Sequence, residues 1–169
     1  MLRISSVAFA ALVAGVVIAT IVDLRTRRIP NVLTGALTGV GLGLAAAGIS
    51  GMSVWAAMLG FGVGLALMLP GHMLGATGAG DVKLMAAIGA VVGPGVAVKA
   101  VLFTLVAGGA LAILVALQRR RLRATLEVTA RMIATPTDTA REIHAAPRAS
   151  RFAYAPAIAI GSVLAVLIG

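Results

Sequence analysis

The sequence has 169 residues, of which 60% are hydrophobic and only 11% charged, and its mean hydropathy is +1.09. This apolar surface exceeds what one soluble core of that length can bury, which excludes an ordinary water-soluble domain and indicates a membrane protein. The formal charge of +9 does not indicate nucleic acid, because only 4% of residues are aromatic and the basic residues flank apolar segments. With no cysteine, disulfides and thiolate sites are excluded, and we expect no metal and no other cofactor.

Apolar segments predict an all-α, polytopic membrane protein with about six transmembrane helices. The first segment is longer than the apolar core of a secretory signal and ends in Asp23 and a cluster of arginines, so we expect it to be retained. A single membrane-embedded domain over residues 1–169 is the predicted organisation. The helices are expected at 4–22, 32–49, 52–70, 81–93, 96–117 and 152–168.

The basic residues predict the orientation of these helices, because cytoplasmic loops retain an excess of Lys and Arg. If the amino terminus lies outside the cytoplasm, twelve of the fourteen Lys and Arg residues face the cytoplasm. Only Arg3 and Lys99 then lie outside. Both termini are therefore predicted to be extracytoplasmic.

One long polar segment, residues 118–151, is predicted to be a basic cytoplasmic loop. Leu122, Leu126 and Ile133 fall on roughly one helical face, so residues 119–134 could form an amphipathic helix on anionic lipid. A solvated loop whose charge reflects only the orientation of the protein is equally consistent.

Glycines at four-residue spacing, Gly35, Gly39 and Gly43, form a stripe in the second predicted helix. Small residues at this spacing allow membrane helices to approach closely. We interpret the stripe as a packing surface.

Two aspartates, Asp23 and Asp81, are the only acidic residues at predicted ends of membrane helices. The predicted topology brings both to the cytoplasmic level, where ionisable groups beside the membrane are costly and usually functional. Two neighbouring carboxylates can share a proton, so that one activates water while the other protonates the carbonyl under attack. The pair therefore indicates an intramembrane aspartyl protease.

Structural roles are the alternative for each residue. Asp81 could simply cap the fourth helix, and Asp23 could pair with Arg25 or Arg27. Helix dipoles also distinguish the two, because a carboxyl end disfavours negative charge and an amino end favours it. On that basis Asp81 is expected to be the ionised member and Asp23 the protonated one.

Three segments in order resemble the type IV prepilin leader peptidases, which carry a Gly-x-Gly-Asp motif. Asp23 followed by Ile29-Pro30-Asn31 is similar to the first aspartate motif of that family. Residues 78–83, Gly-Ala-Gly-Asp-Val-Lys, are similar to the second, and residues 154–158, Tyr-Ala-Pro-Ala-Ile, to the carboxy-terminal signature.

The resemblance implies that Asp23 and Asp81 are the catalytic pair of a bacterial inner-membrane peptidase. It would remove the short basic leader of prepilin substrates at the cytoplasmic face. The remaining motif residues would bind substrate or shape the loops around the pair: Gly78, Gly80, Lys83, Pro30 and Asn31. The chain lacks the paired cysteines and large insertion of bifunctional members, so it resembles the short branch that serves Flp-type pili and has no methyltransferase activity.

Two other functions stay open at this point. Intramembrane acids also serve as proton relays, so a small proton-coupled transporter or channel is the alternative. An inactive scaffold subunit of a pilus-assembly machine is a third possibility.

Overall fold

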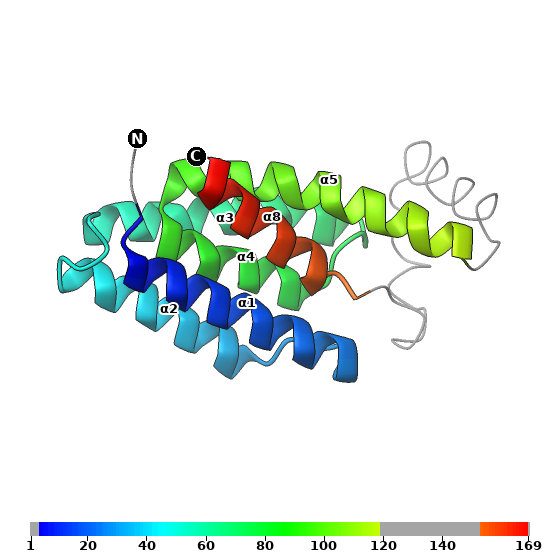
Figure 1. Ribbon diagram of the computed structural model, residues 1–169, viewed down its shortest axis with the longest axis horizontal. Helices are drawn as coiled ribbons and strands as arrows, with labels where there is room; N and C mark the ends of the chain where they lie inside the picture. The colour runs from blue at the N-terminus through cyan, green and yellow to red at the C-terminus, as the bar shows by residue number, and fades with distance from the viewer. Residues whose placement is uncertain (1–3, 119–152, 169) are drawn as a thin grey trace.

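The computed structural model describes residues 4–118 and 153–168, and these residues form six α-helices and no strand. The helices lie alongside one another as one elongated bundle (Figure 1). The predicted all-α class is confirmed, and each helix overlaps one of the six predicted segments. Residues 119–134, where a surface helix on lipid was considered, lie outside the described residues. The helices are α1 (Ser6–Thr26), α2 (Asn31–Ala46), α3 (Val54–Met73), α4 (Ala79–Val92), α5 (Pro94–Gln118) and α8 (Ala155–Ile168).

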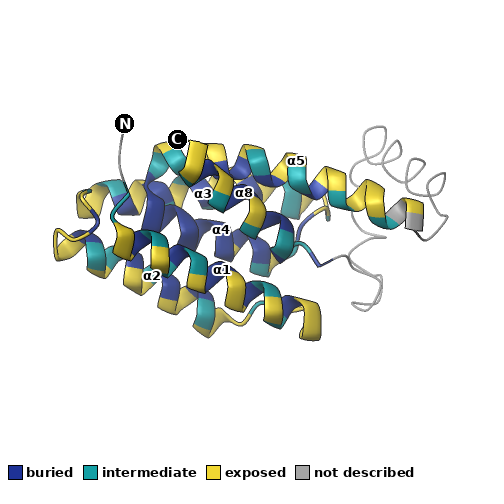
Figure 2. Cartoon of the chain, viewed as in Figure 1, coloured by how far each residue is buried: buried dark blue, intermediate teal, exposed yellow. Residues whose placement is uncertain are grey.

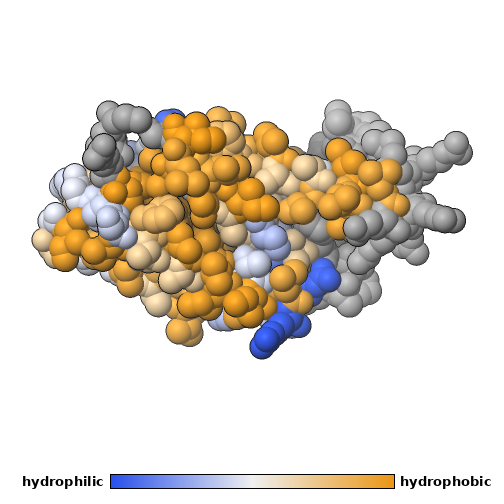
Figure 3. Space-filling view, in the orientation of Figure 1, coloured by the Kyte–Doolittle hydropathy of each residue, from blue (hydrophilic) through white to orange (hydrophobic). Residues whose placement is uncertain are grey.

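Three of these helices are long and apolar enough to cross a bilayer: α1, α3 and the Pro94–Val115 part of α5. The other three, α2, α4 and α8, have 16, 14 and 14 residues. The face of the described bundle that Figure 3 shows is mainly apolar. Large apolar side chains of the bundle, such as Ile18, Leu59 and Val106, are exposed. Such an exposed apolar surface is expected of a protein surrounded by lipid.

The central helix is α4, which packs against all five other described helices. From Asp81 to Val92 every residue except Lys83 is buried, as Figure 2 shows by the dark colour of this helix. A helix that is apolar on all sides is typical of an interior position. Since α4 is enclosed by protein on all sides, its 14 residues need not reach the length of a helix that faces lipid.

Glycine allows α3 to approach α4 until their backbones touch. A Cβ atom built at Gly60 would collide with the carbonyl oxygen of Gly89, and one built at Gly89 with that of Gly60. One turn further along, a Cβ atom at Gly64 would lie 2.5 Å from the carbonyl oxygen of Met85. Small residues therefore make the α3–α4 contact possible.

The interpretation of the α2 glycine stripe as a packing surface is wrong for contacts among the described residues. Gly35, Gly39 and Gly43 are exposed there, and a Cβ atom at any of them would meet no described atom within 4 Å. The glycine of α2 that does pack is Gly41, where a Cβ atom would lie 2.8 Å from the backbone of Ala90 in α4. The stripe lies on the opposite side of α2 from the side that packs on α4.

Candidate active site

Asp23 lies in the last turn of α1 and points into the bundle. The buried residues of this helix recur at spacings of three and four and include Leu12, Val16 and Ala19. Asp23 follows Ala19 by four residues and so continues the buried stripe, which leaves it only 6% exposed. The helix ends at Arg27, which adopts a left-handed conformation and donates its N–H to the Asp23 carbonyl oxygen at 2.8 Å.

Asp81 lies in the first turn of the central helix α4 and is 8% exposed. Its Oδ2 atom accepts a hydrogen bond of 2.8 Å from the N–H of Gly78, the residue that precedes the helix. A Cβ atom at Gly78 would lie 3.0 Å from that oxygen, so glycine leaves room for the carboxylate to close over its own helix end. The capping role considered for Asp81 is real, but it engages one of the two carboxylate oxygens.

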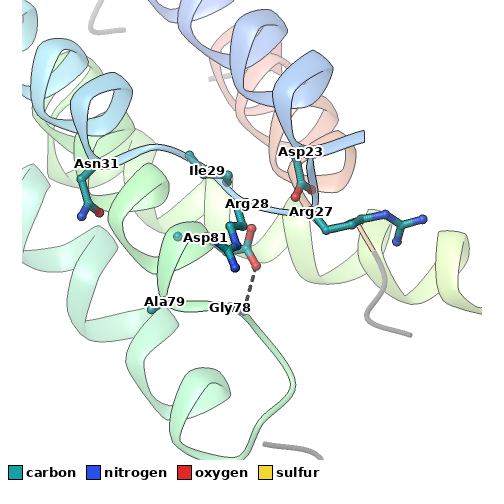
Figure 4. A pocket seen from close by; sticks show the side chains of 9 residues that line it. Asp23, Arg27, Arg28, Ile29, Asn31, Gly78, Ala79 and Asp81 are labelled. Carbon is teal, nitrogen blue, oxygen red and sulfur yellow. Dashed lines mark hydrogen bonds between the residues drawn. The ribbon is translucent and has the colours of Figure 1, made fainter. Parts of the chain in front are cut away.

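The two carboxylates face one open cavity of about 390 Å³. Figure 4 shows the cavity between the end of α1, the segment that leads to α2 and the beginning of α4. The cavity joins the first and second sequence motifs. Its lining consists of Asp23, Arg27, Arg28, Ile29, Asn31, Gly78, Ala79, Gly80 and Asp81.

Two contacts hold these motifs against each other. The Nζ atom of Lys83 donates a hydrogen bond of 2.9 Å to the Oδ1 atom of Asn31. A Cβ atom at Gly80 would lie 3.1 Å from the Cβ atom of Ile29, so the segment before α2 crosses directly over the first turn of α4. Pro30 immediately precedes α2, and its carbonyl oxygen accepts the first helical hydrogen bonds. A loop-shaping function for the non-acidic motif residues stays a prediction.

A third segment reaches Asp23 from the other end of the sequence. The N–H of Ala155, the first residue of α8, donates a hydrogen bond of 3.2 Å to Oδ2 of Asp23, and this bond is buried. Asp23 therefore lies at the amino end of α8 as well as at the carboxyl end of α1. The helix dipoles therefore do not distinguish the two aspartates, because both carboxylates meet the favourable end of a helix, and the assignment of the ionised member stays a prediction. Sequence reasoning missed this contact, since a backbone amide has no side-chain signature.

Chemically, the site offers two largely buried carboxylates on the wall of an open cavity, each accepting one backbone N–H. Such a pair can act as general base and general acid on a water molecule and a substrate carbonyl. The glycines at positions 78 and 80 leave the backbone of the loop accessible on the same wall.

Comparison with known proteins agrees with this geometry. The model of the type IV leader peptidase family matches residues 10–116, which is more than half of the chain and includes both aspartates. No match was found among curated proteins or among solved structures. The chain therefore belongs to the type IV leader peptidase family and is an aspartic-type peptidase of the membrane.

Proposed function

We propose that the protein removes the short basic leader of Flp-type prepilins at the cytoplasmic membrane face, with Asp23 and Asp81 as the catalytic pair. The observation that carries the proposal is that both carboxylates, from separate helices, line one cavity. Membership of a peptidase family favours hydrolysis over the transporter and channel alternatives.

The proposed reaction needs only water and the two carboxyl groups. The ionised carboxylate takes a proton from water as the water oxygen attacks the scissile carbonyl carbon. The protonated carboxyl group gives its proton to the carbonyl oxygen, and a tetrahedral intermediate forms. As the C–N bond breaks, the leaving nitrogen takes a proton from the former base, and the former acid takes back a proton from a hydroxyl group of the intermediate, so both carboxyl groups return to their starting states. The products are the free leader carboxylate and the new amino terminus of the pilin.

Charge supports the cytoplasmic assignment of the cavity. Arg25, Arg27, Arg28 and Lys83 are exposed at the end of the bundle where the two aspartates lie. Figure 3 shows hydrophilic side chains near the end of α1, beside a mainly apolar surface. Cytoplasmic loops carry this excess of positive charge. We propose on the same grounds that the bundle is a multi-pass domain of the inner membrane with both termini outside the cytoplasm.

The short segment between α1 and α2 supports a peptidase without methyltransferase activity. Only residues 27–30 connect these two helices. The chain also has no cysteine. We therefore expect a cleaved pilin whose new amino terminus is unmethylated, which mass spectrometry of the product can measure.

Coexpression with a Flp-type prepilin tests the catalytic pair. Asp23→Asn and Asp81→Asn keep an oxygen that can accept the backbone hydrogen bond but remove the acid-base function. Each should reduce leader removal at least about a hundredfold. Asp138→Asn, at the only other aspartate in the sequence, is the matched control and should process normally. Normal processing by either Asp23→Asn or Asp81→Asn would refute the pair.

A further inference from the structure

The hydrogen bond between Ala155 and Asp23 joins the active site to the segment that resembles the carboxy-terminal signature, which lies beyond the residues matched by the family model. That match ends at residue 116, within α5, whereas the donor to Oδ2 of Asp23 is the first residue of α8. We infer that the amino end of α8 is a positioning element of the peptidase. In this inference, which rests on the proposed role of Asp23, the N–H of Ala155 holds the carboxylate in its reactive orientation and Tyr154 holds Ala155 in place.

Ala155 is the residue at this helix end with an N–H directed to Asp23. The first N–H groups of any helix have no acceptor within the helix. Pro156 has no N–H, and the N–H groups of Ala157 and Ile158 donate to the carbonyl oxygen of Tyr154 at 3.0 and 3.2 Å. The N–H of Ala155 thus donates to a carboxylate that is itself buried. A hydrogen bond to a charged group is strongest in such a low-dielectric environment.

Tyr154 attaches this helix end to α5. Its hydroxyl group donates to the carbonyl oxygen of Thr104 at 3.4 Å. Its ring lies against Gly108, where a Cβ atom would come within 2.6 Å of the ring edge and of the hydroxyl oxygen. Further along α8, Gly161 lies against the backbone of Thr104. These contacts place the beginning of α8 on α5 and thereby place the N–H of Ala155.

The packing of α8 explains how a distant segment can position a group on α1. The helix contacts α1, α4 and α5, and Figure 1 shows it lying across the bundle between α1 and α5. Asp23 is on α1 and Asp81 on α4, so α8 touches both helices that carry the aspartates. A rotation of the Asp23 side chain would change the position of its carboxylate relative to that of Asp81 without changing the fold. Small displacements of a catalytic group reduce the reaction rate strongly.

The decisive variant is Ala155→Pro, because proline removes the N–H and is compatible with the first position of a helix. With the full-length protein and the Flp-type prepilin that it cleaves, kcat should fall about tenfold to a hundredfold while KM stays within about twofold. Ala155→Gly retains the N–H, adds no atom to this fully buried position and should lose far less kcat than Ala155→Pro. Equal loss of kcat in both variants would show a packing effect and would overturn the inference.

Two neighbouring glycines provide a second test at a distance from the carboxylates. Gly108→Ala pushes against the Tyr154 ring and should lower kcat with little effect on KM, whereas Gly109→Ala meets nothing within 4 Å and should behave as native. If Ala155→Pro does not fold, this pair decides: equal kcat for Gly108→Ala and Gly109→Ala would overturn the inference.

The results separate this inference from the proposed function. Loss of activity in Asp23→Asn with native kcat in Ala155→Pro would overturn the positioning role and leave the catalytic pair standing. Full activity in Asp23→Asn would remove the catalytic pair, and the inference with it.

Discussion

Lys83 and Asn31 are joined by a hydrogen bond of 2.9 Å between the ammonium Nζ and the amide Oδ1, although Asn31 begins α2 and Lys83 lies in the second turn of α4. The bond is exposed and therefore contributes little to stability. It does connect the two motifs that line the cavity, so its main effect should be on the geometry of the site.

We predict that Lys83→Met lowers peptidase activity more than it lowers stability. The unfolding free energy should change by less than about 1 kcal/mol, because an exposed hydrogen bond is lost. Activity should fall about tenfold, because the crossing of the two motifs is loosened. Thermal unfolding in detergent and prepilin cleavage measure the two quantities.

The control for Lys83→Met is Lys99→Met, since Lys99 is an exposed lysine of α5 away from the cavity. Combining Lys83→Met with Asn31→Ala should cost little more activity than either change alone, because both remove the same bond. Fully additive losses would contradict a shared function.

Gly80→Ala should reduce peptidase activity by displacing the segment before α2, which crosses over the first turn of α4. The added methyl group would lie 3.1 Å from the Cβ atom of Ile29, so the segment that leads from Asp23 to α2 must shift. We expect the unfolding free energy to fall by about 1–3 kcal/mol. The rate of prepilin cleavage should fall by a larger fraction than the unfolding free energy. Gly95→Ala, near the beginning of α5 with nothing within 4 Å, is the control that should retain both.

Gly60→Ala tests the backbone contact between α3 and α4. The new methyl group would collide with the carbonyl oxygen of Gly89, and backbone cannot move aside as a side chain can. We predict a destabilisation of at least about 2 kcal/mol, measured by unfolding in detergent. Gly62→Ala, in the same helix but facing open space, should be neutral or stabilising by up to about 1 kcal/mol. Similar effects of the two changes would argue against this contact.

Another glycine pair, in α2, tests which face of this helix packs on α4. Gly41→Ala places a methyl group 2.8 Å from the backbone of Ala90 and should cost about 1–3 kcal/mol of unfolding free energy. Gly43→Ala should stay within about 0.5 kcal/mol, because that glycine is exposed with nothing nearby. The reverse order would restore the original interpretation of the glycine stripe.

The sequence by itself determined the membrane class, the six described helices and the position of Asp23 and Asp81 at helix ends. Apolar segments of this length have few alternatives to a helix in a bilayer. The motifs around Asp81 likewise identified the family that the comparison then showed.

Only the tertiary structure decided which surfaces meet. A helix that is apolar on every side gives no sign of which side faces protein and which faces lipid, so the sequence could not show that the glycine stripe of α2 is exposed in the described bundle. The contact between Ala155 and Asp23 was equally hidden, since its donor is a backbone amide that any residue except proline would supply. Both depend on how helices distant in sequence pack together, and that packing places the amino end of α8 against the carboxylate of Asp23.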